Sequence, residues 1–445
     1  MKVIAALTEA EFGRAITAST RRGQVVVACA FAVMFLTFGA AYSFSAFFAS
    51  LQQAFGASRG EIALSFSIAV PLYYLVGAIS GPLADRVGSR ATCIFGTVMA
   101  GSGLMFAAAA NSLWQIHVGF GLGLGVGIGF SYVPAIAAVQ RWYVRHRGFA
   151  SGIAVSGIGF GTLLVPPFTA MLIEWSGWRG AWTVLGLSII VIGSAASLFI
   201  DNSPSRYGAL PDGGIVGLGT NSGFGLAEGY SLRQAVASRP FILLYASLIT
   251  IWIGASIPFV HLVPYAEDCG LSHGTAVTIF GLVGIGSIAG RFLLGRAADR
   301  IGLRFLLAAV FAGVALMQLW WLAAATAWQL AMFAFVFGVC YGGFVALYPA
   351  LIVAYFGNRN VSGIMGVLYT GGAAGSFLGP KLAGDAFDAF GSYTIPIAIG
   401  AACAVLAVVL VVSAPEPGLA GINPASRKPL EPFPFRQNRN GALDS

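Results

Sequence analysis

Twelve long apolar runs, separated by short polar turns, make up most of this 445-residue chain. Each run reaches the roughly 20 residues that an α-helix needs to cross the ~30 Å hydrocarbon core of a bilayer. Hydrophobic residues account for 58% of the chain and charged residues for only 9%, whereas about a quarter of an average soluble domain is charged. The sequence therefore predicts an all-α integral membrane protein and excludes soluble enzymes, secreted domains and disordered chains.

The apolar runs fall into two groups of six. We expect six-helix bundles at 23–200 and 239–413, a cytoplasmic linker at 201–238, a cytoplasmic segment at 1–22 and a disordered cytoplasmic tail at 414–445. The predicted spans are 24–49, 61–83, 91–110, 113–139, 149–172, 179–200, 239–264, 274–297, 304–324, 327–355, 361–387 and 392–413. This pattern predicts twelve transmembrane helices in a six-plus-six arrangement.

The basic residues indicate the orientation in the membrane. With the N-terminus inside, only Arg59 and Arg179 of the 24 Lys and Arg fall on external loops, and Arg291 and Lys381 fall within spans. The others lie on the cytoplasmic side, where basic residues collect in membrane proteins. We therefore expect a multi-pass protein of the inner (cytoplasmic) membrane with both termini in the cytoplasm. No loop combines basic and aromatic residues in the manner of a nucleic-acid-binding surface.

A ten-residue motif occurs twice, each time just after the second span of its half. Gly-Pro-Leu-Ala-Asp-Arg-Val-Gly-Ser-Arg at 81–90 returns as Gly-Arg-Ala-Ala-Asp-Arg-Ile-Gly-Leu-Arg at 295–304, an offset of 214 residues. Pro134 and Pro349 repeat at nearly the same offset. Parallel repeats of six helices, with a binding site between them near the membrane midplane, are a transporter architecture.

The two motifs, in register on this frame, resemble the major facilitator superfamily over nearly the whole chain. The resemblance implies transport by alternating access between the two halves. It also implies that the motifs gate the cytoplasmic side. The implied gate residues are Gly81, Asp85, Arg86, Gly88, Arg90, Gly295, Asp299, Arg300, Gly302 and Arg304.

A finer resemblance is to the monocarboxylate transporter-like branch, which includes oxalate/formate antiporters. It rests on an aromatic and basic cluster followed by small residues at 142–152, on the sequence around Arg291, and on the segment 387–393. Arg291 matches the arginine that binds substrate in this branch. However, Ser287 stands where animal carriers have an Asp one turn earlier, and the first span has no Lys. The resemblance therefore does not identify the substrate or the coupling ion.

Arg291 is the candidate site residue with the clearest physical reason. A charged side chain within a span costs at least ~2.5 kcal/mol, so we expect it to face a water-filled cavity. Its planar guanidinium suits a bidentate carboxylate. The alternatives are snorkelling to the cytoplasmic surface and a structural ion pair.

Tyr132 and Tyr348, beside the repeated prolines, are candidates to hydrogen-bond a small polar substrate, with aromatic packing as the alternative. His261 is a candidate for substrate binding and for proton coupling, because histidine titrates near neutral pH. A buried histidine that is simply hydrogen-bonded to a neighbour explains it equally well.

Lys381 and Asp385 are spaced i,i+4 on the eleventh span. They are expected either to form a structural ion pair or to take part in substrate binding or proton coupling. Oxalate-type antiporters carry a Lys in this helix. Asp388 is expected to be a solvated residue at the outer end of the same helix.

The sequence as a whole predicts a secondary active transporter of small monocarboxylates resembling lactate or pyruvate. Proton symport is preferred. An oxalate/formate-type anion exchanger and an exporter of another metabolite or drug are the alternatives. The partners are then a small carboxylate, a proton or an exchanged anion, and the lipid bilayer. The chain has no nucleotide-binding loop, metal-ligand cluster or catalytic triad, so we expect no enzyme activity, cofactor or metal.

Overall fold

The structure is a computed structural model that describes residues 2–143, 147–201, 204, 230–357 and 361–415. The regular elements of these ranges are helices. The N-terminal half contains α1 (Lys2–Tyr42), α2 (Phe44–Phe55), α3 (Arg59–Val87), α4 (Ser89–Ala108), α5 (Leu113–Ile116), η1 (His117–Leu124), α6 (Gly125–Trp142), α7 (Arg147–Ser188), η2 (Ile189–Gly193) and α8 (Ser194–Ser197). The C-terminal half contains α9 (Leu232–Val236), α10 (Arg239–Ser256), α11 (Pro258–Asp268), α12 (His273–Ile301), α13 (Leu303–Ala323), α14 (Ala327–Phe356), α15 (Val361–Phe390) and α16 (Thr394–Ser413).

Ten continuous helical stretches of the described chain are long and apolar enough to cross a membrane. One of them, Ala150–Ser197, has 48 residues, which is too long for a single crossing. Gly177 interrupts it with a non-helical conformation, so this stretch crosses twice. The 30-residue α15 supplies a further crossing, although its glycines, Lys381 and Asp385 make it less apolar. The predicted fold class, twelve transmembrane helices in two groups of six, is confirmed.

The first helix of each half is interrupted. α1 ends at Tyr42 and α2 begins at Phe44, while α10 ends at Ser256 and α11 begins at Pro258. Proline has no backbone N–H and cannot continue the helical hydrogen-bond ladder, which explains the second break. In membrane transporters such discontinuous helices line the binding site.

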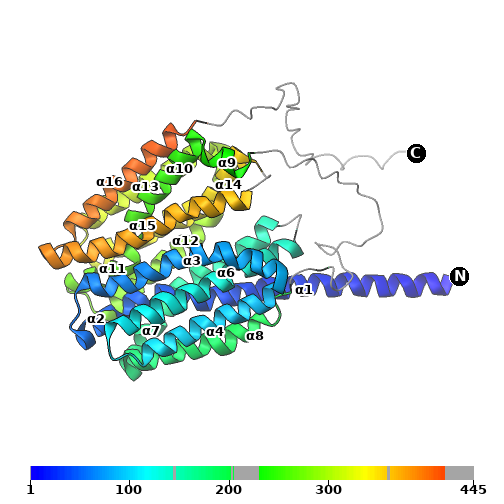
Figure 1. The fold of residues 1–445 in the computed structure, drawn as a ribbon, viewed down its shortest axis with the longest axis horizontal. Helices are drawn as coiled ribbons and strands as arrows, with labels where there is room; N and C mark the ends of the chain where they lie inside the picture. Colours follow the sequence, from blue (N-terminus) through cyan, green and yellow to red (C-terminus); the bar gives the residue numbers. More distant parts are fainter. Residues whose placement is uncertain (1, 144–146, 202–203, 205–229, 358–360, 416–445) are drawn as a thin grey trace, which may run out of the picture.

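The two halves meet along three helix pairs. The second helix of each half packs against the fifth helix of the other, α3 against α15 and α12 against α7. The first helices meet where α2 contacts α11. Figure 1 shows one of these pairs, with the orange α15 running alongside the blue α3.

The repeated motif ends the second helix of each half with the same backbone conformation. Gly88 follows α3 with φ 98° and ψ 142°, and Gly302 follows α12 with φ 88° and ψ 136°. Side chains strongly disfavour this positive φ, so both positions require glycine. The internal repeat in the sequence is therefore also a repeat in backbone geometry.

The last arginine of each motif ties the third helix of its half to the last one. Arg90 on α4 forms an ion pair with Asp201, just after α8. Arg304 on α13 donates a hydrogen bond to the carbonyl oxygen of Val412 on α16. Each contact joins the third helix of a half to the last segment of the same half.

Close packing of α12 on α14 fixes the backbone that carries Arg291. A Cβ added at Gly286 or Gly290 would run into the α14 backbone, and one at Gly338 or Gly342 would run into the α12 backbone. Small residues spaced four apart let membrane helices approach to backbone contact. Arg291 therefore projects from a helix whose position is tightly defined.

Most of the predicted linker 201–238 and nearly all of the predicted tail 414–445 lie outside the described residues. The predicted cytoplasmic segment 1–22 forms the first part of α1, which continues without a break into the first span.

Candidate functional site

Arg291 lies on α12 and reaches across to the other half. Its Nη1 donates a hydrogen bond to the carbonyl oxygen of Val155 on α7 at 3.0 Å. Its Nε is buried without a hydrogen-bond partner, and among the described residues no carboxylate forms an ion pair with it. The side chain is half-buried. A guanidinium with unused donors therefore lies between the halves.

Three tyrosine side chains lie near this charge. The side chains that interact electrostatically with Arg291 are those of Tyr42, Tyr132 and Tyr341. The hydroxyls of Tyr42 on α1 and Tyr341 on α14 are 3.1 Å apart, a hydrogen bond that joins the two halves. We call Tyr42, Tyr132, Arg291 and Tyr341 the central site. Each half contributes two of its members.

Aromatic rings pack around the central site from both halves. Phe38 meets Tyr132 edge-on with ring centroids 5.3 Å apart. Phe259 stacks on Tyr42 at 4.8 Å. Trp252 meets Tyr341 edge-on at 5.9 Å. Apolar walls with a few oriented polar groups are typical of small-molecule sites, and here those groups are one cation and three hydroxyls.

Lys381 and Asp385 form an ion pair on α15. The Lys381 Nζ lies 2.5 Å from both carboxylate oxygens of Asp385. The two side chains are 29% and 46% exposed. This geometry corresponds to the structural pair that was one of the two expectations, and it leaves the Lys381 charge already neutralised.

His261 lies away from the charge of Arg291, in a polar network between α11 and the end of α15. Its Nδ1 is 3.1 Å from the Tyr393 hydroxyl, and its Nε2 is 2.9 Å from the Pro380 carbonyl oxygen. The ring is fully buried, with Phe48 of α2 edge-on to it. Both ring nitrogens are therefore engaged with protein, and neither is available to a substrate in this conformation.

Tyr348 is packed inside the C-terminal half. It is 1% exposed, and its hydroxyl donates to the Leu244 carbonyl oxygen at 2.6 Å and lies 2.8 Å from the Ser247 hydroxyl. Tyr132, the tyrosine near the other repeated proline, is half-buried at the central site. The structure thus brings Tyr132 together with Arg291 and places Tyr348 in the helix packing of α14 on α10.

The repeated motif is described only in part. The side chains of Asp85, Asp299 and Arg300 lie outside the described residues, and so do the surroundings of Gly295. Among the rest, Gly81 packs on Val133 of α6, Arg86 is exposed, and Gly88, Arg90, Gly302 and Arg304 make the backbone and side-chain contacts given above. The gate function of the motif stays a prediction.

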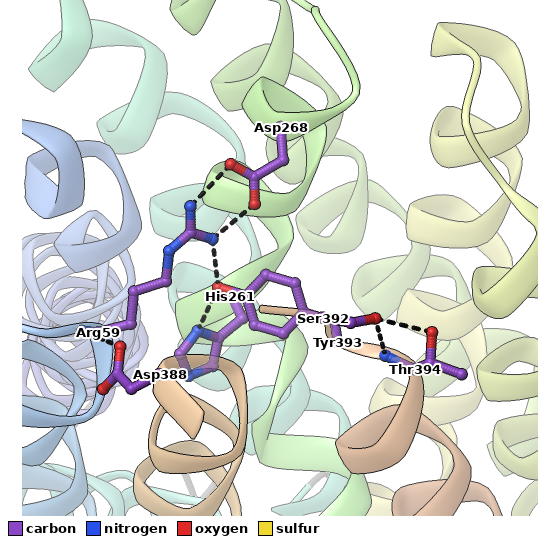
Figure 2. Close-up of polar contacts among 7 residues, drawn as sticks. All are labelled: Arg59, His261, Asp268, Asp388, Ser392, Tyr393 and Thr394. Atoms are coloured by element: carbon purple, nitrogen blue, oxygen red, sulfur yellow. Dashed lines mark hydrogen bonds and ion pairs between the residues drawn. The ribbon is translucent and has the colours of Figure 1, made fainter. Parts of the chain in front are cut away.

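A second polar cluster joins the two halves (Figure 2). It lies at the start of α3, the end of this helix that is opposite to the repeated motif. Arg59, the first residue of α3, donates from Nη1 and Nη2 to the two carboxylate oxygens of Asp268 at 2.6 and 2.7 Å. Its Nη1 also donates to the Tyr393 hydroxyl at 2.7 Å. Asp388 accepts hydrogen bonds from the backbone N–H groups of Arg59 and Gly60 at 2.9 and 2.8 Å. Asp388 is exposed, as expected at a helix end, and it also caps α3.

The sequence analysis did not assign Tyr42, Tyr341, Arg59 or Asp268 to a site. Nothing in the sequence distinguishes Tyr42 and Tyr341 from other tyrosines in membrane helices. Only the fold brings their hydroxyls together. Arg59 carried one signal, because it is one of only two basic residues on the predicted external loops. A charge that departs from the positive-inside distribution is a reason to look for a partner.

Comparison with known proteins agrees with this architecture. The protein-family model of the Major Facilitator Superfamily matches residues 30–322 and 262–443. A bacterial homologue of the human lysosomal transporter Spinster, solved in an inward-facing and unoccupied conformation, superimposes with a TM-score of 0.63 and 14% sequence identity. The match covers 88% of this chain and 95% of that one.

Curated relatives are named as monocarboxylate transporters. Monocarboxylate transporter 12 of Rattus norvegicus is 28% identical over 398 residues, covering 84% of this chain and 81% of the relative. Monocarboxylate transporter 11 of Homo sapiens is 26% identical over 383 residues, covering 84% and 78%. The chain therefore belongs to the major facilitator superfamily, as a multi-pass membrane transporter similar to the monocarboxylate transporters.

Proposed function

We propose that this protein is a secondary active transporter of small monocarboxylates that works by alternating access and binds the carboxylate at Arg291. One observation carries the proposal: a half-buried guanidinium between the two halves whose Nε has no partner and which no described carboxylate neutralises. An uncompensated charge within the membrane is costly, so an anionic ligand is strongly favoured there. The names of the relatives support the same substrate class.

The number of unpaired basic groups near the central site favours a substrate with one carboxylate over a substrate with two. A dicarboxylate such as oxalate requires a second cation facing the first. The Lys381 ammonium, which is the other basic group within the predicted spans, is bound by both oxygens of Asp385. The aromatic rings around Tyr42, Tyr132 and Tyr341 instead suit the apolar body of a monocarboxylate.

The hydroxyls of the central site give the substrate its orientation. When a carboxylate takes two donors of Arg291, the Tyr132 and Tyr341 hydroxyls can donate to its outer lone pairs or to a 2-hydroxyl or 2-keto oxygen. Val155 holds only one Nη1 hydrogen of the guanidinium. Nη2 and the second hydrogen of Nη1 are left for the ligand.

Coupling by anion exchange is a second candidate mechanism beside proton symport. No described Asp, Glu or His contacts Arg291, while Asp385 is paired with Lys381 and His261 is bound through both ring nitrogens. An empty carrier then has to reorient with a buried, unneutralised guanidinium, whereas a loaded carrier does not. Exchange of one monocarboxylate for another avoids the empty step.

Counterflow in proteoliposomes tests the proposal. Vesicles loaded with unlabelled acetate, lactate, pyruvate or benzoate are diluted into the labelled acid, with and without a pH gradient. We expect transient accumulation for monocarboxylates and little for oxalate. Accumulation that needs the internal anion supports exchange, and accumulation in empty vesicles that needs an acid exterior supports proton symport. Absence of flux for every carboxylate, from protein that is folded, refutes the substrate class.

A further inference from the structure

The helix ends that carry Arg59 hold the two halves together at the side opposite the repeated cytoplasmic motif. We infer that Arg59, Asp268, Asp388 and the contact between Gly60 and Gly384 form the extracellular gate of this transporter. We call this set the Arg59 gate. The inference rests on the predicted orientation and on alternating access, and it adds residues that neither the motifs nor the central site identify.

The ion pair of the gate has the geometry of a strong one. Both terminal nitrogens of Arg59 bond the two oxygens of Asp268, so the pair is bidentate and joins α3 to α11. The Arg59 side chain is only 11% exposed, and its guanidinium lies 3.9 Å from the ring centroid of Phe387. Stacking and a planar fork require arginine, because a lysine ammonium supplies neither.

The second contact of the gate is a helix cap provided by the other half. Asp388 of α15 accepts the first two free backbone N–H groups of α3, at Arg59 and Gly60. A carboxylate is favoured at this position, because the N-terminus of a helix is positively polarised. Ser58 and Glu61 independently form a capping box on the same helix end. When the halves separate, water can replace Asp388 while the capping box keeps α3 intact, so the contact is reversible.

The third contact is steric. A Cβ added at Gly384 would lie 2.6 Å from the Gly60 Cα, and one added at Gly60 would collide with Asp385. The α3 and α15 backbones therefore touch at this point, which is possible only between glycines. Any larger side chain at either position holds the two helix ends apart and prevents the hydrogen bonds to Asp388 from forming.

These three contacts involve different atoms but break in the same motion. Each joins α3 of one half to α11 or α15 of the other. Separation of α3 from α15 would open a route past Phe48 and His261 toward Tyr42 and Tyr341. The structure is thus the state in which the external side is closed.

The experiment measures the external distance between the halves without any substrate. Spin labels are placed at Asn111→Cys and Ala325→Cys in a background whose native cysteines are replaced, and the distance distribution is recorded by pulsed electron paramagnetic resonance. Both positions are exposed and contribute only backbone N–H groups to hydrogen bonds. They lie in equivalent loops of the two halves, so the distance reports their separation.

We expect Gly384→Ala and Asp388→Ala each to move most of the population to a longer distance, and Arg59→Lys to move part of it. Gly366→Ala is the matched control, because it lies on the same helix and its added Cβ has no neighbour within 4 Å. Its distribution should match the parent. Parent-like distributions for Gly384→Ala, Asp388→Ala and Arg59→Lys would overturn the inference.

If Gly384→Ala fails to fold, Asp388→Ala and Arg59→Lys still test the gate. Both side chains lie at helix ends, so we expect these two variants to fold. The readout is also independent of the proposed substrate. Distances that shift as expected in a protein that moves no carboxylate would sustain the gate and refute the substrate class. Carboxylate counterflow in the parent, together with unchanged distances in the variants, would sustain the substrate class and refute the gate.

Discussion

The hydroxyl of Tyr393 and Nδ1 of His261 lie 3.1 Å apart and form a hydrogen bond. Neighbouring groups indicate its direction when the His261 ring is neutral. Arg59 has only donors, so the Tyr393 oxygen accepts from it, and the Pro380 carbonyl accepts only, so the His261 Nε2 must carry a hydrogen. In the neutral ring with its hydrogen on Nε2, Nδ1 accepts from the Tyr393 hydroxyl, so both hydrogens have acceptors. We infer this form for the closed Arg59 gate.

This assignment predicts that acid opens the external side. A second proton, on Nδ1, would leave the Tyr393 hydrogen without its acceptor and add a positive charge near Arg59, with Asp268 and Asp388 as the nearest acids. The closed state should therefore lose population as the pH falls and the His261 ring takes up this proton. The spin-label distance across a pH series measures the effect.

His261→Gln is the matching variant, because a glutamine amide can accept from Tyr393 and donate to Pro380 without titrating. We expect it to remove the pH dependence of the distance and of uptake while it keeps the closed state. A pH dependence identical to that of the parent would show that another group binds the proton.

Substitution of Lys381 should have little effect on monocarboxylate affinity. Its ammonium is already bound by Asp385, and an exposed i,i+4 pair is worth only about 0.3–0.5 kcal/mol. We expect Lys381→Met to change the half-saturating concentration by less than about threefold. A loss of more than tenfold in counterflow assays would mean that Lys381 reaches the substrate in another conformation.

The glycine contact between α12 and α14 should be intolerant of a methyl group. Gly342→Ala places a Cβ against the α12 backbone, and such overpacking typically costs about 1–3 kcal/mol. Thermal unfolding in detergent should show a lower midpoint for Gly342→Ala. Gly366→Ala, which meets open space, should keep the midpoint of the parent.

The orientation is tested by labelling single cysteines from outside intact cells. Asn111→Cys, in a loop expected to be external, should react with a membrane-impermeant thiol reagent. Ser205→Cys and Ser426→Cys, which lie outside the described residues, should react only after the cells are opened. Labelling of Ser205→Cys or Ser426→Cys in intact cells would reverse the predicted orientation and make the Arg59 gate cytoplasmic.

The features that the sequence predicted well are those with local or periodic signals. Helix length, hydropathy and the duplicated motif were enough to predict the twelve helices, and Arg291 stood out because a charge within a span needs a reason. The predicted span 361–387 corresponds to α15, although its glycines lower the hydropathy of this helix. The site residues beyond Arg291 and Tyr132 depend on pairings between distant residues.

Such pairings leave no trace in a single sequence. The Tyr42 and Tyr341 hydroxyls meet across 299 residues, and Arg59 meets Tyr393 across 334. His261 attracted attention for its titration, but its chemistry follows from Tyr393 and Pro380, which only the packing of α11 on α15 reveals. The two tyrosines beside the repeated prolines also differ in their surroundings, since Tyr132 joins the central site while Tyr348 bonds within its own half.

The most direct test of the account is the affinity of the purified protein for a monocarboxylate and for its neutral amide, measured by calorimetry in the parent and in Arg291 variants. With lactate or pyruvate, whichever shows the stronger counterflow, we expect binding in the parent, about 10- to 100-fold weaker binding in Arg291→Lys as a charge-assisted fork is lost, and none detectable in Arg291→Ala. The amide should not bind the parent. Near-parental affinity of Arg291→Ala for the carboxylate would contradict the account, because the arginine would then be structural.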